Sequence, residues 1–404
     1  MVQQVMNVLL AILMFFIATT LISLAVRGKE IRFGKHRLSF VIGGVLLFVG
    51  TERVPRTVKP INRGLSYAMI ASVFIGIALF YASFLPMMIR FIASFVGSAL
   101  GMTHATPKPV VVPVPLLFQY TSIIPYILLG IGTAIVFHEI AHAVVALREG
   151  IPVKSWGIGV FLLVPIAFVE LEDEKFLSAS RIARLKVVSA GVFSNMVVAI
   201  AAFLVMTLLS HTVLALASPA IMVKNLCCSI CVPPCPSKLA GIQPGDIITA
   251  IDGHAVHSLE DLVRALSKHR PNETVDIMLC RPSGACRVVT LRLSSMVKNK
   301  SRPCIGVELV QSFAVFRGLT AYIPQYLSMV IALYRAMFYV FIINYSLFAL
   351  NSIPLIITDG TKFLDFLVEG RRFESFFKRR YVDIVNAVVI AIAMTVSTYL
   401  LLVR

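Results

Sequence analysis

Long apolar stretches alternate with short polar ones along most of the chain. Six of these stretches are long enough, and poor enough in charge, to cross a bilayer as helices. They lie at about residues 4–26, 65–88, 121–147, 182–209, 322–350 and 382–403. The pattern therefore predicts an α-helical multi-pass membrane protein with about six transmembrane helices.

Two further apolar stretches are too short to cross a bilayer as helices. Residues 38–50 are rich in Phe, Val and Gly, which favours a membrane-associated strand or hairpin. Residues 157–169 are interrupted by Gly159 and Pro165, and we expect a re-entrant loop or a sheet packed on the core there. The proline-rich stretch 107–115 is expected to be extended.

Residues 219–310 differ from the rest of the chain. Charge rises, turn residues multiply, and short apolar strands alternate with an amphipathic helix near residues 259–267, which predicts a small extramembrane α+β domain. Its segment 240–253, Ala-Gly-Ile-Gln-Pro-Gly-Asp-Ile-Ile-Thr-Ala-Ile-Asp-Gly, resembles the core signature of PDZ domains of the prokaryotic protease type. That resemblance implies a sheet edge and a groove for an extended peptide ligand. A structural plug without a ligand is the alternative.

Composition excludes a soluble protein. Of the 404 residues, 58% are hydrophobic and 14% are charged, and the mean hydropathy is +0.88. The formal charge is +17, and nine Lys and Arg fall between Arg27 and Arg63 and six between Lys362 and Arg380, beside apolar stretches. These clusters predict cytoplasmic loops, which places the domain at 219–310 on the extracytoplasmic side. No basic patch is interleaved with aromatic residues, so we expect no nucleic-acid partner.

The third apolar stretch contains His138-Glu139-Ile140-Ala141-His142. On a helix, two histidines four residues apart lie on one face and can hold one zinc ion, while Glu139 can take a proton from a zinc-activated water. Between residues 122 and 147, His138, Glu139 and His142 are the only Asp, Glu, His, Lys or Arg residues. Ionisable groups at membrane depth are costly and usually mark function.

Catalytic zinc sites generally use three protein ligands and keep a fourth position for water. Asp359 is the best remaining candidate, because it precedes Gly360 at the cytoplasmic end of the fifth span, at the depth assigned to His142. The other distal carboxylates lie among charges that water would solvate: residues 170–174, Asp365, Glu369 and Glu374. The alternative is that Asp359 only caps the helix that follows it.

These motifs together resemble the site-2 protease family of intramembrane zinc metalloproteases. The resemblance rests on the histidine motif, the PDZ-like insertion, Gly191-Val192-Phe193-Ser194-Asn195, Asn351-x-x-Pro354 and Asp359-Gly360, and covers residues 121–210 and 320–370. It implies Zn²⁺ bound by His138, His142 and Asp359, with Glu139 as the general base. Thr358 departs from the leucine usual before Asp-Gly, so the local packing is expected to differ.

Two asparagines lie in apolar surroundings near these motifs. Asn195 and Asn351 are candidates for binding the substrate backbone or the developing oxyanion. Hydrogen bonds between membrane helices are an equally good interpretation of both residues.

The seven cysteines fall on the side expected to lie outside the cytoplasm, where disulfides persist. A Cys280–Cys286 bridge is one expectation, and a structural zinc site at Cys227, Cys228, Cys231 and Cys235 is another. Reduced, unlinked cysteines remain a third possibility, and the odd number leaves at least one thiol free or paired between chains.

The sequence thus predicts four regions: a two-span region with a basic loop at 1–120, the first half of the catalytic core at 121–218, the PDZ-like domain at 219–310, and the second half of the core at 311–404. The function implied by the resemblance is a zinc endopeptidase that cuts membrane-anchored proteins or peptides in the lipid bilayer, in regulated intramembrane proteolysis or remnant-peptide clearance. The alternative is a proteolytically inactive membrane scaffold that binds peptides through its PDZ-like domain.

Overall fold

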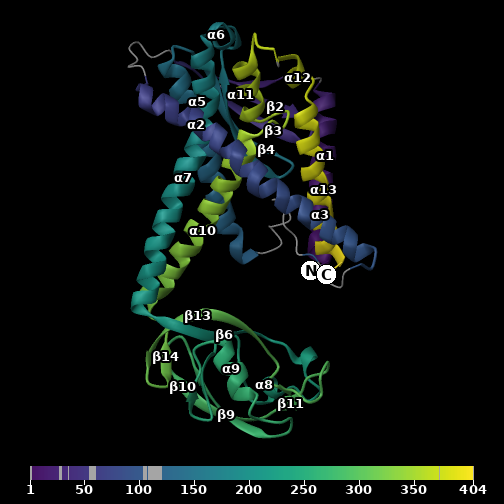
Figure 1. Cartoon of the computed structure of the whole chain (residues 1–404), viewed down its shortest axis with the longest axis vertical. Helices are drawn as coiled ribbons and strands as arrows, with labels where there is room; N and C mark the ends of the chain where they lie inside the picture. Colours follow the sequence, from purple (N-terminus) through teal and green to yellow (C-terminus); the bar gives the residue numbers. More distant parts are fainter. Residues whose placement is uncertain are drawn as a thin grey trace. The chain divides into compact units, whose positions relative to one another are not determined.

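The computed structural model describes residues 2–26, 30–34, 36–53, 61–102, 107, 121–372 and 374–403. The chain forms two compact units, one made of Met1–Phe203 with Ala336–Arg404 and the other of Leu204–Arg335 (Figure 1). The expected extended stretch at 107–115 lies, apart from Pro107, outside the described residues.

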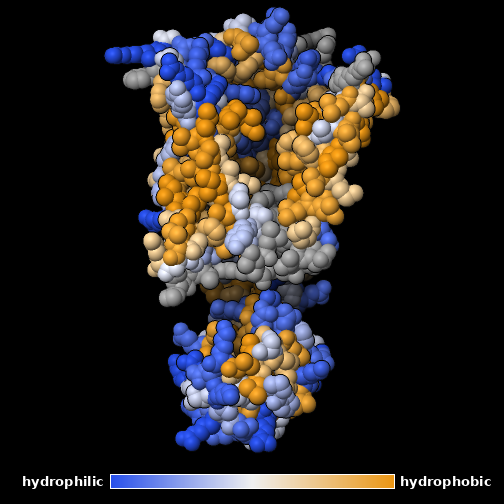
Figure 2. Space-filling model, turned by 90° about the vertical axis from the view of Figure 1, so that its right-hand side faces the viewer, coloured by the Kyte–Doolittle hydropathy of each residue, from blue (hydrophilic) through white to orange (hydrophobic). Residues whose placement is uncertain are grey.

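Long apolar helices dominate the first unit. They are α1 (Val2–Ala25), α2 (Arg63–Leu79), a π-helical turn η1 (Phe80–Phe84), α3 (Leu85–Ala99), α5 (Ile124–Arg148), α7 (Arg181–Leu216), α10 (Gln325–Ser352) and α13 (Tyr381–Val403). The end of α7, from Leu204, and the start of α10, up to Arg335, belong to the second unit. Shorter helices are η2 (Thr121–Ile123), α6 (Asp173–Ser178), α11 (Asp359–Val368) and α12 (Glu374–Lys378). Broad apolar areas cover the sides of this unit, as expected of helices that face lipid (Figure 2).

Five helical segments within the described ranges are long and apolar enough to cross a membrane: Arg63–Ala99, Ile124–Arg148, Arg181–Leu216, Gln325–Ser352 and Tyr381–Leu401. The expected first span forms helix α1, but the apolar part of that helix, Leu9–Ala25, is shorter than these five. The structure therefore supports a multi-pass membrane protein and leaves the count of six spans as a prediction.

The two short apolar stretches pair in one antiparallel sheet of the first unit. Its strands are β1 (Ile31–Phe33), β2 (His36–Val41), β3 (Gly44–Arg53), β4 (Val153–Phe161) and β5 (Val164–Leu171), in that spatial order. The hairpin expected at 38–50 is β2–β3, and the sheet expected at 157–169 is β4–β5, so both expectations of β-structure are confirmed. The pairing of β3 with β4 joins the two hairpins.

The second unit is an α+β fold, and the face of it seen in Figure 2 mixes polar and apolar areas. Its main strands are β6 (Ser218–Leu226), β7 (Ile247–Ile251), β8 (His254–Ala255), β9 (Thr274–Cys280), β10 (Cys286–Arg292), β13 (Val307–Arg317) and β14 (Thr320–Tyr322). The spatial order is β10-β9-β7-β6-β13-β14, with β8 paired to β7. Smaller elements are η3 (Cys228–Ile230), α8 (Pro236–Leu239), α9 (Leu259–Leu266), β11 (Ser294–Ser295) and β12 (Pro303–Cys304).

The expected amphipathic helix of this unit is α9. Ser258 caps it, because its side chain accepts a hydrogen bond from the backbone N–H of Asp261 and the Asp261 carboxylate bonds back to Ser258. The helix buries Leu262 and Ala265 in the same apolar core as strand residues such as Ile248. The sheet and α9 of the second unit therefore share one buried apolar core.

Three disulfides stabilise the second unit: Cys228–Cys235, Cys231–Cys304 and Cys280–Cys286. The expected Cys280–Cys286 bridge is therefore confirmed. A zinc site at residues 227–235 is wrong, because the Cys231 sulfur is bonded to Cys304, far along the chain, and Cys228 to Cys235. Cys227 is the free thiol that the odd number of cysteines requires.

Candidate metal centre

Helix α5 carries both histidines of the motif on one face. His138 is buried and His142 is half-buried, and their rings lie edge to face with centroids 4.7 Å apart. Their Nε2 atoms are 3.1 Å apart. The helical repeat of 3.6 residues places side chains four positions apart one above the other, so the sequence spacing by itself brings the two imidazoles together.

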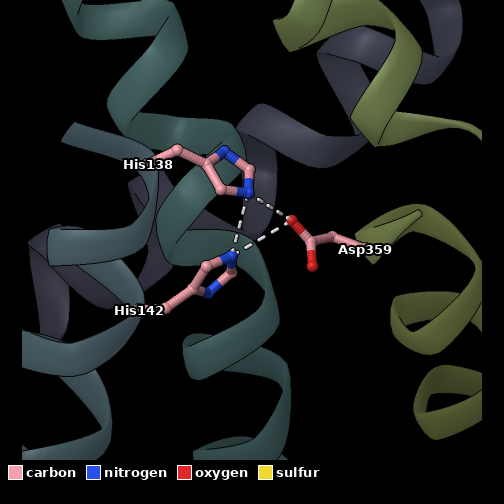
Figure 3. A group of neighbouring side chains, drawn as sticks. All are labelled: His138, His142 and Asp359. Carbon is pink, nitrogen blue, oxygen red and sulfur yellow. Dashed lines mark hydrogen bonds and ion pairs between the residues drawn. The ribbon is translucent and has the colours of Figure 1, made fainter. Parts of the chain in front are cut away.

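Asp359, at the start of α11, completes the group. Its Oδ2 lies 3.0 Å from Nε2 of His138 and 3.2 Å from Nε2 of His142. Figure 3 shows the three side chains pointing toward one another from the two helices. Within the described part of the chain, this is the one group of three such side chains whose ligand atoms all lie within 4.8 Å of one another.

The three atoms fit a zinc ion. Zinc–ligand bonds of about 2.0–2.1 Å in a tetrahedron place neighbouring ligand atoms about 3.3 Å apart, close to the separations seen here. His142 donates from Nδ1 to the backbone oxygen of Val187 over 2.7 Å, which leaves a lone pair on its Nε2. Two imidazole nitrogens and a carboxylate oxygen converge on one point, and a cation bound there would relieve their repulsion.

Helix α7 packs against the two imidazoles through Gly191. A Cβ atom at this position would lie 2.4 Å from Nε2 of His142 and 2.5 Å from Nε2 of His138. These distances are far inside van der Waals contact, so a side chain larger than hydrogen would displace the rings. The two histidine rings can therefore occupy these positions only because residue 191 is glycine.

Asn195 lies one turn further along α7 and is completely buried. Its amide nitrogen is placed 3.2 Å from Nδ1 of His138, and its Oδ1 has no hydrogen-bond partner among the described residues. Asn351, in the last turn of α10, lines the same cavity, but no hydrogen bond within the described ranges joins it to His138, His142 or Asp359. The two asparagines, for which the sequence offered the same two interpretations, therefore differ in the structure: Asn195 contacts His138, and Asn351 does not.

A cavity of about 1320 Å³ opens onto this group and onto Glu139. All residues of β5 line it, together with parts of α5 and α10. Glu139 is half-buried, and the backbone N–H of Val169 on β5 is directed at its carboxylate. β5 is an outer strand of the sheet, and no other strand within the described ranges pairs with its second edge.

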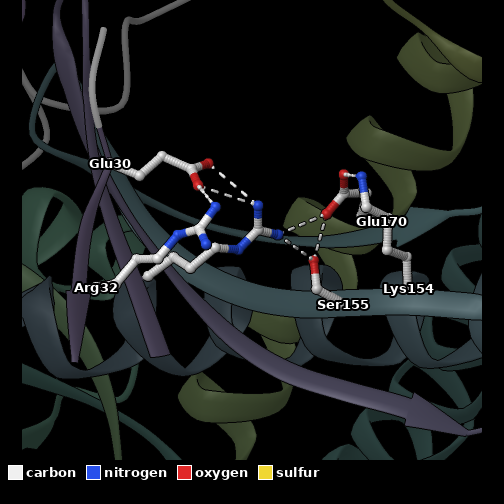
Figure 4. Close-up of polar contacts among 6 residues, drawn as sticks. Glu30, Arg32, Lys154, Ser155 and Glu170 are labelled. Atoms are coloured by element: carbon white, nitrogen blue, oxygen red, sulfur yellow. Dashed lines mark hydrogen bonds and ion pairs between the residues drawn. The ribbon is translucent and has the colours of Figure 1, made fainter. Parts of the chain in front are cut away.

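A polar network holds the end of β5 (Figure 4). Glu170 accepts hydrogen bonds from Lys154, Ser155 and Arg37, at 2.7 Å from the lysine and 3.0 Å from the guanidinium, and Arg37 also pairs with Glu30. Burial alone would raise the pKa of Glu170, but the hydrogen bonds from Lys154 and Ser155 outweigh it and hold the pKa below its ordinary value of 4.5. Glu170 therefore lies among charges, as expected, and it is also bonded to them and partly buried.

Sequence comparison places the chain among metalloproteases. The family model of Peptidase family M50 matches residues 126–396, a range that contains all the residues described above on α5, α7 and α11. A protein of Methanocaldococcus jannaschii is 26% identical over 297 residues, which cover 72% of this chain and 74% of that protein. A Clostridium perfringens protein named "Putative zinc metalloprotease" is 29% identical over 174 residues, 37% of this chain and 49% of that protein.

Proposed function

This chain belongs to peptidase family M50, the site-2 protease family of metalloproteases, and we propose that it is a zinc endopeptidase that cuts membrane-anchored proteins or peptides within the bilayer. The observation that carries the proposal is the convergence of His138, His142 and Asp359 beside Glu139, in a cavity among helices that are apolar enough to span a membrane. Release of a regulator and clearance of remnant peptides are the two biological roles that such an activity serves.

His138 and His142 would hold zinc through Nε2, and Asp359 through a carboxylate oxygen. Zinc bound there would supply Lewis acidity, which polarises the scissile carbonyl and makes a water molecule acidic enough to attack near neutral pH. The remaining steps belong to side chains of this protein.

Glu139 is the general base in this proposal. It follows His138 directly on α5 and lines the same cavity, so its carboxylate lies beside the place where water and substrate would meet. It takes the proton of the attacking water and passes it to the amide nitrogen that leaves. The N–H of Val169 helps to hold the carboxylate in place.

Asn195 orients His138. A histidine that binds metal through Nε2 carries its proton on Nδ1, and that N–H needs an acceptor. The oxygen and nitrogen of an amide are distinguished by their hydrogen bonds, and turning the Asn195 amide over presents Oδ1 to Nδ1 and gives this buried oxygen its missing partner. We therefore propose that Asn195 orients the metal ligand His138. Asn351 remains the candidate for contact with the substrate backbone.

The free edge of β5 is the proposed binding strand for substrate. A transmembrane helix must unwind before its carbonyl can reach the metal, and the exposed peptide groups then need new hydrogen-bond partners. An outer strand beside the cavity supplies these partners by strand addition. Apolar side chains around the cavity suit the apolar side chains of a membrane-anchored substrate.

The second unit is proposed to be a PDZ-like domain outside the cytoplasm that selects substrates or binds a peptide ligand. The resemblance of residues 240–253 supports this assignment, and three disulfides suit an oxidising compartment. The basic loops of the first unit would then lie in the cytoplasm.

Cleavage of a single-span model substrate by the purified chain in proteoliposomes tests the proposal. We expect Glu139→Gln to lower the rate about 10²–10⁴-fold while zinc stays bound, and a zinc chelator to abolish cleavage. Glu174→Gln, which neutralises an exposed carboxylate on α6, is the matched control and should retain the rate. Full activity of Glu139→Gln would refute the mechanism, whereas absence of cleavage by the unaltered chain would favour the scaffold.

A further inference from the structure

The turn between α10 and α11 decides where the Asp359 carboxylate points. It spans residues 353–358 and contains Ile356 in the left-handed region, with φ of +59°, which is costly for a β-branched residue. At its end, a Cβ on Gly360 would lie 2.2 Å from the backbone oxygen of Ser352, so the chain doubles back closely on α10. Such a turn needs contacts from outside to keep its shape.

Two threonine hydroxyls brace the turn from within. Thr358 donates to the backbone oxygen of Ile353 over 2.6 Å and accepts from the backbone N–H of Leu355. Thr361 accepts from the same N–H over 2.9 Å. The hydroxyl of Thr358 accounts for the departure from leucine at this position, because leucine could make neither hydrogen bond.

Asp383, on α13, binds the turn from outside. Its side chain is 2% exposed, and its Oδ1 accepts from the backbone N–H of Ile356 and from the hydroxyl of Thr361, each over 2.8 Å. Asn386, one helical turn along, donates to the backbone oxygen of Pro354 over 2.9 Å. Helix α13 therefore contacts the turn at Pro354 and Ile356, and it contacts the start of α11 at Thr361, two positions after Asp359.

A buried carboxylate at the start of an apolar helix is costly and is retained where it has a task. Asp383 is not a candidate metal ligand, since it does not belong to the group formed by His138, His142 and Asp359. Its two hydrogen bonds both go to the turn that delivers the third ligand. They link the conformation of that turn to the position of α13.

We propose that Asp383 is a positioning residue for the metal site, which holds the 353–361 segment so that the Asp359 carboxylate faces His138 and His142. The proposal deepens the proposed function, on which its zinc readout rests. It also implies that α13 cannot move away from the turn without loosening the third ligand. Asn386 supports the same contact through Pro354.

Zinc affinity of the purified full chain, measured by competition with a chromophoric chelator, tests the role. Asp383→Leu should weaken zinc binding about 10–100-fold, the range for residues that orient metal ligands. Asp383→Asn keeps an acceptor oxygen at the same place and should stay close to the unaltered chain. Asp365→Leu is the control, because Asp365 pairs with Arg380 rather than with the turn.

Thr361→Val removes one of the two hydrogen bonds of Asp383 with almost no change of shape. It also removes one acceptor of the Leu355 N–H, which Thr358 still accepts. It should weaken zinc binding in the same direction as Asp383→Leu, and the double variant should lose less than the sum of the two single changes. If Asp383→Leu does not fold, Thr361→Val decides the matter by itself. Unchanged zinc affinity in a folded Asp383→Leu, or in Thr361→Val, would overturn the proposal.

Hydrogen exchange provides a readout that does not depend on zinc. Because Asp383 accepts from the N–H of Ile356, exchange in the segment 353–361 should be faster in Asp383→Leu than in Asp383→Asn, with or without metal. Equal exchange would contradict the role of Asp383. Absence of zinc from the unaltered chain would instead contradict the proposed function, while the exchange result would still decide what Asp383 does.

Discussion

Gly191 shows how closely single residues determine the candidate metal centre. The two imidazoles of α5 occupy the space in which a Cβ atom of α7 would stand. Helix α7 can therefore approach the histidines closely enough for Val187 and Asn195 to bond their Nδ1 atoms. The hydrogen bonds on the Nδ1 side direct both Nε2 atoms toward Asp359.

Gly191→Ala is expected to lower zinc affinity by about tenfold or more, because the added methyl displaces the rings that bind it. Gly132→Ala is a matched control on α5, since a Cβ at Gly132 meets nothing within 4 Å. Both affinities are obtained by chelator competition on the purified variants. Equal affinity in the two variants would show that the rings are free to move aside.

At this scale the sequence predicted what depends on local spacing. The histidines stand one turn apart on any α-helix, and Asp359 could be chosen because other carboxylates lie among charges. The contact of Asn195 with His138 and the role of Asp383 depend on how helices are rotated against each other, which spacing along one helix does not reveal. An acid near the start of an apolar helix was the available signal for Asp383.

Strand β5 is the element that connects the sheet to the candidate metal centre. It lines the cavity along its whole length and is fixed at one end by the pairing of Glu170 with Lys154, Ser155 and Arg37. The sequence predicted β-structure at 38–50 and 157–169, because both stretches are too short to cross the bilayer. It could not predict that the two hairpins pair, because their strands are more than a hundred residues apart.

The network at Glu170 should make the stability of the first unit depend on pH. Because the pKa of Glu170 is lower in the folded protein than its ordinary 4.5, its contribution is fully present above pH 4.5 and is lost as pH falls through the lower folded value. The contribution is about 1 kcal/mol or less, since the pair is partly exposed.

Thermal unfolding followed at a series of pH values below 5 checks this expectation. Glu170→Gln should lower the melting temperature at neutral pH and flatten its dependence on pH. Glu308→Gln, which removes an exposed pair with Lys224 in the second unit, should leave the unfolding of the first unit unchanged. A pH dependence as steep in Glu170→Gln as in the unaltered chain would exclude the network as its cause.

The two units of the molecule are stabilised by different interactions. The first buries its cavity and candidate ligands among apolar helices, whereas all three disulfides lie in the second. From the change in charge and turn residues near 219, the sequence predicted a separate domain at 219–310, and the Cys280–Cys286 bridge across a turn was one of its alternatives. The pairing of Cys231 with Cys304 required the fold, because 73 positions separate them.

Reduction of the disulfides should therefore destabilise the second unit and leave the first unit unchanged. Opening the Cys231–Cys304 loop alone is expected to destabilise the second unit by about 4 kcal/mol, from the entropy returned to its unfolded chain. Limited proteolysis followed by mass spectrometry should show cuts between residues 204 and 335 after treatment with a phosphine reductant. Zinc content should not change, and its loss on reduction would contradict a metal site built solely from the first unit.

The zinc content of three purified proteins tests the central claim most directly. We predict one zinc per chain in the unaltered protein and in Asp365→Ala, and little or none in Asp359→Ala, because Asp359 completes the ligand set while Asp365 pairs with Arg380. Elemental analysis after removal of loosely bound metal gives the numbers. An unaltered chain without zinc, or Asp359→Ala with as much zinc as Asp365→Ala, would contradict the account.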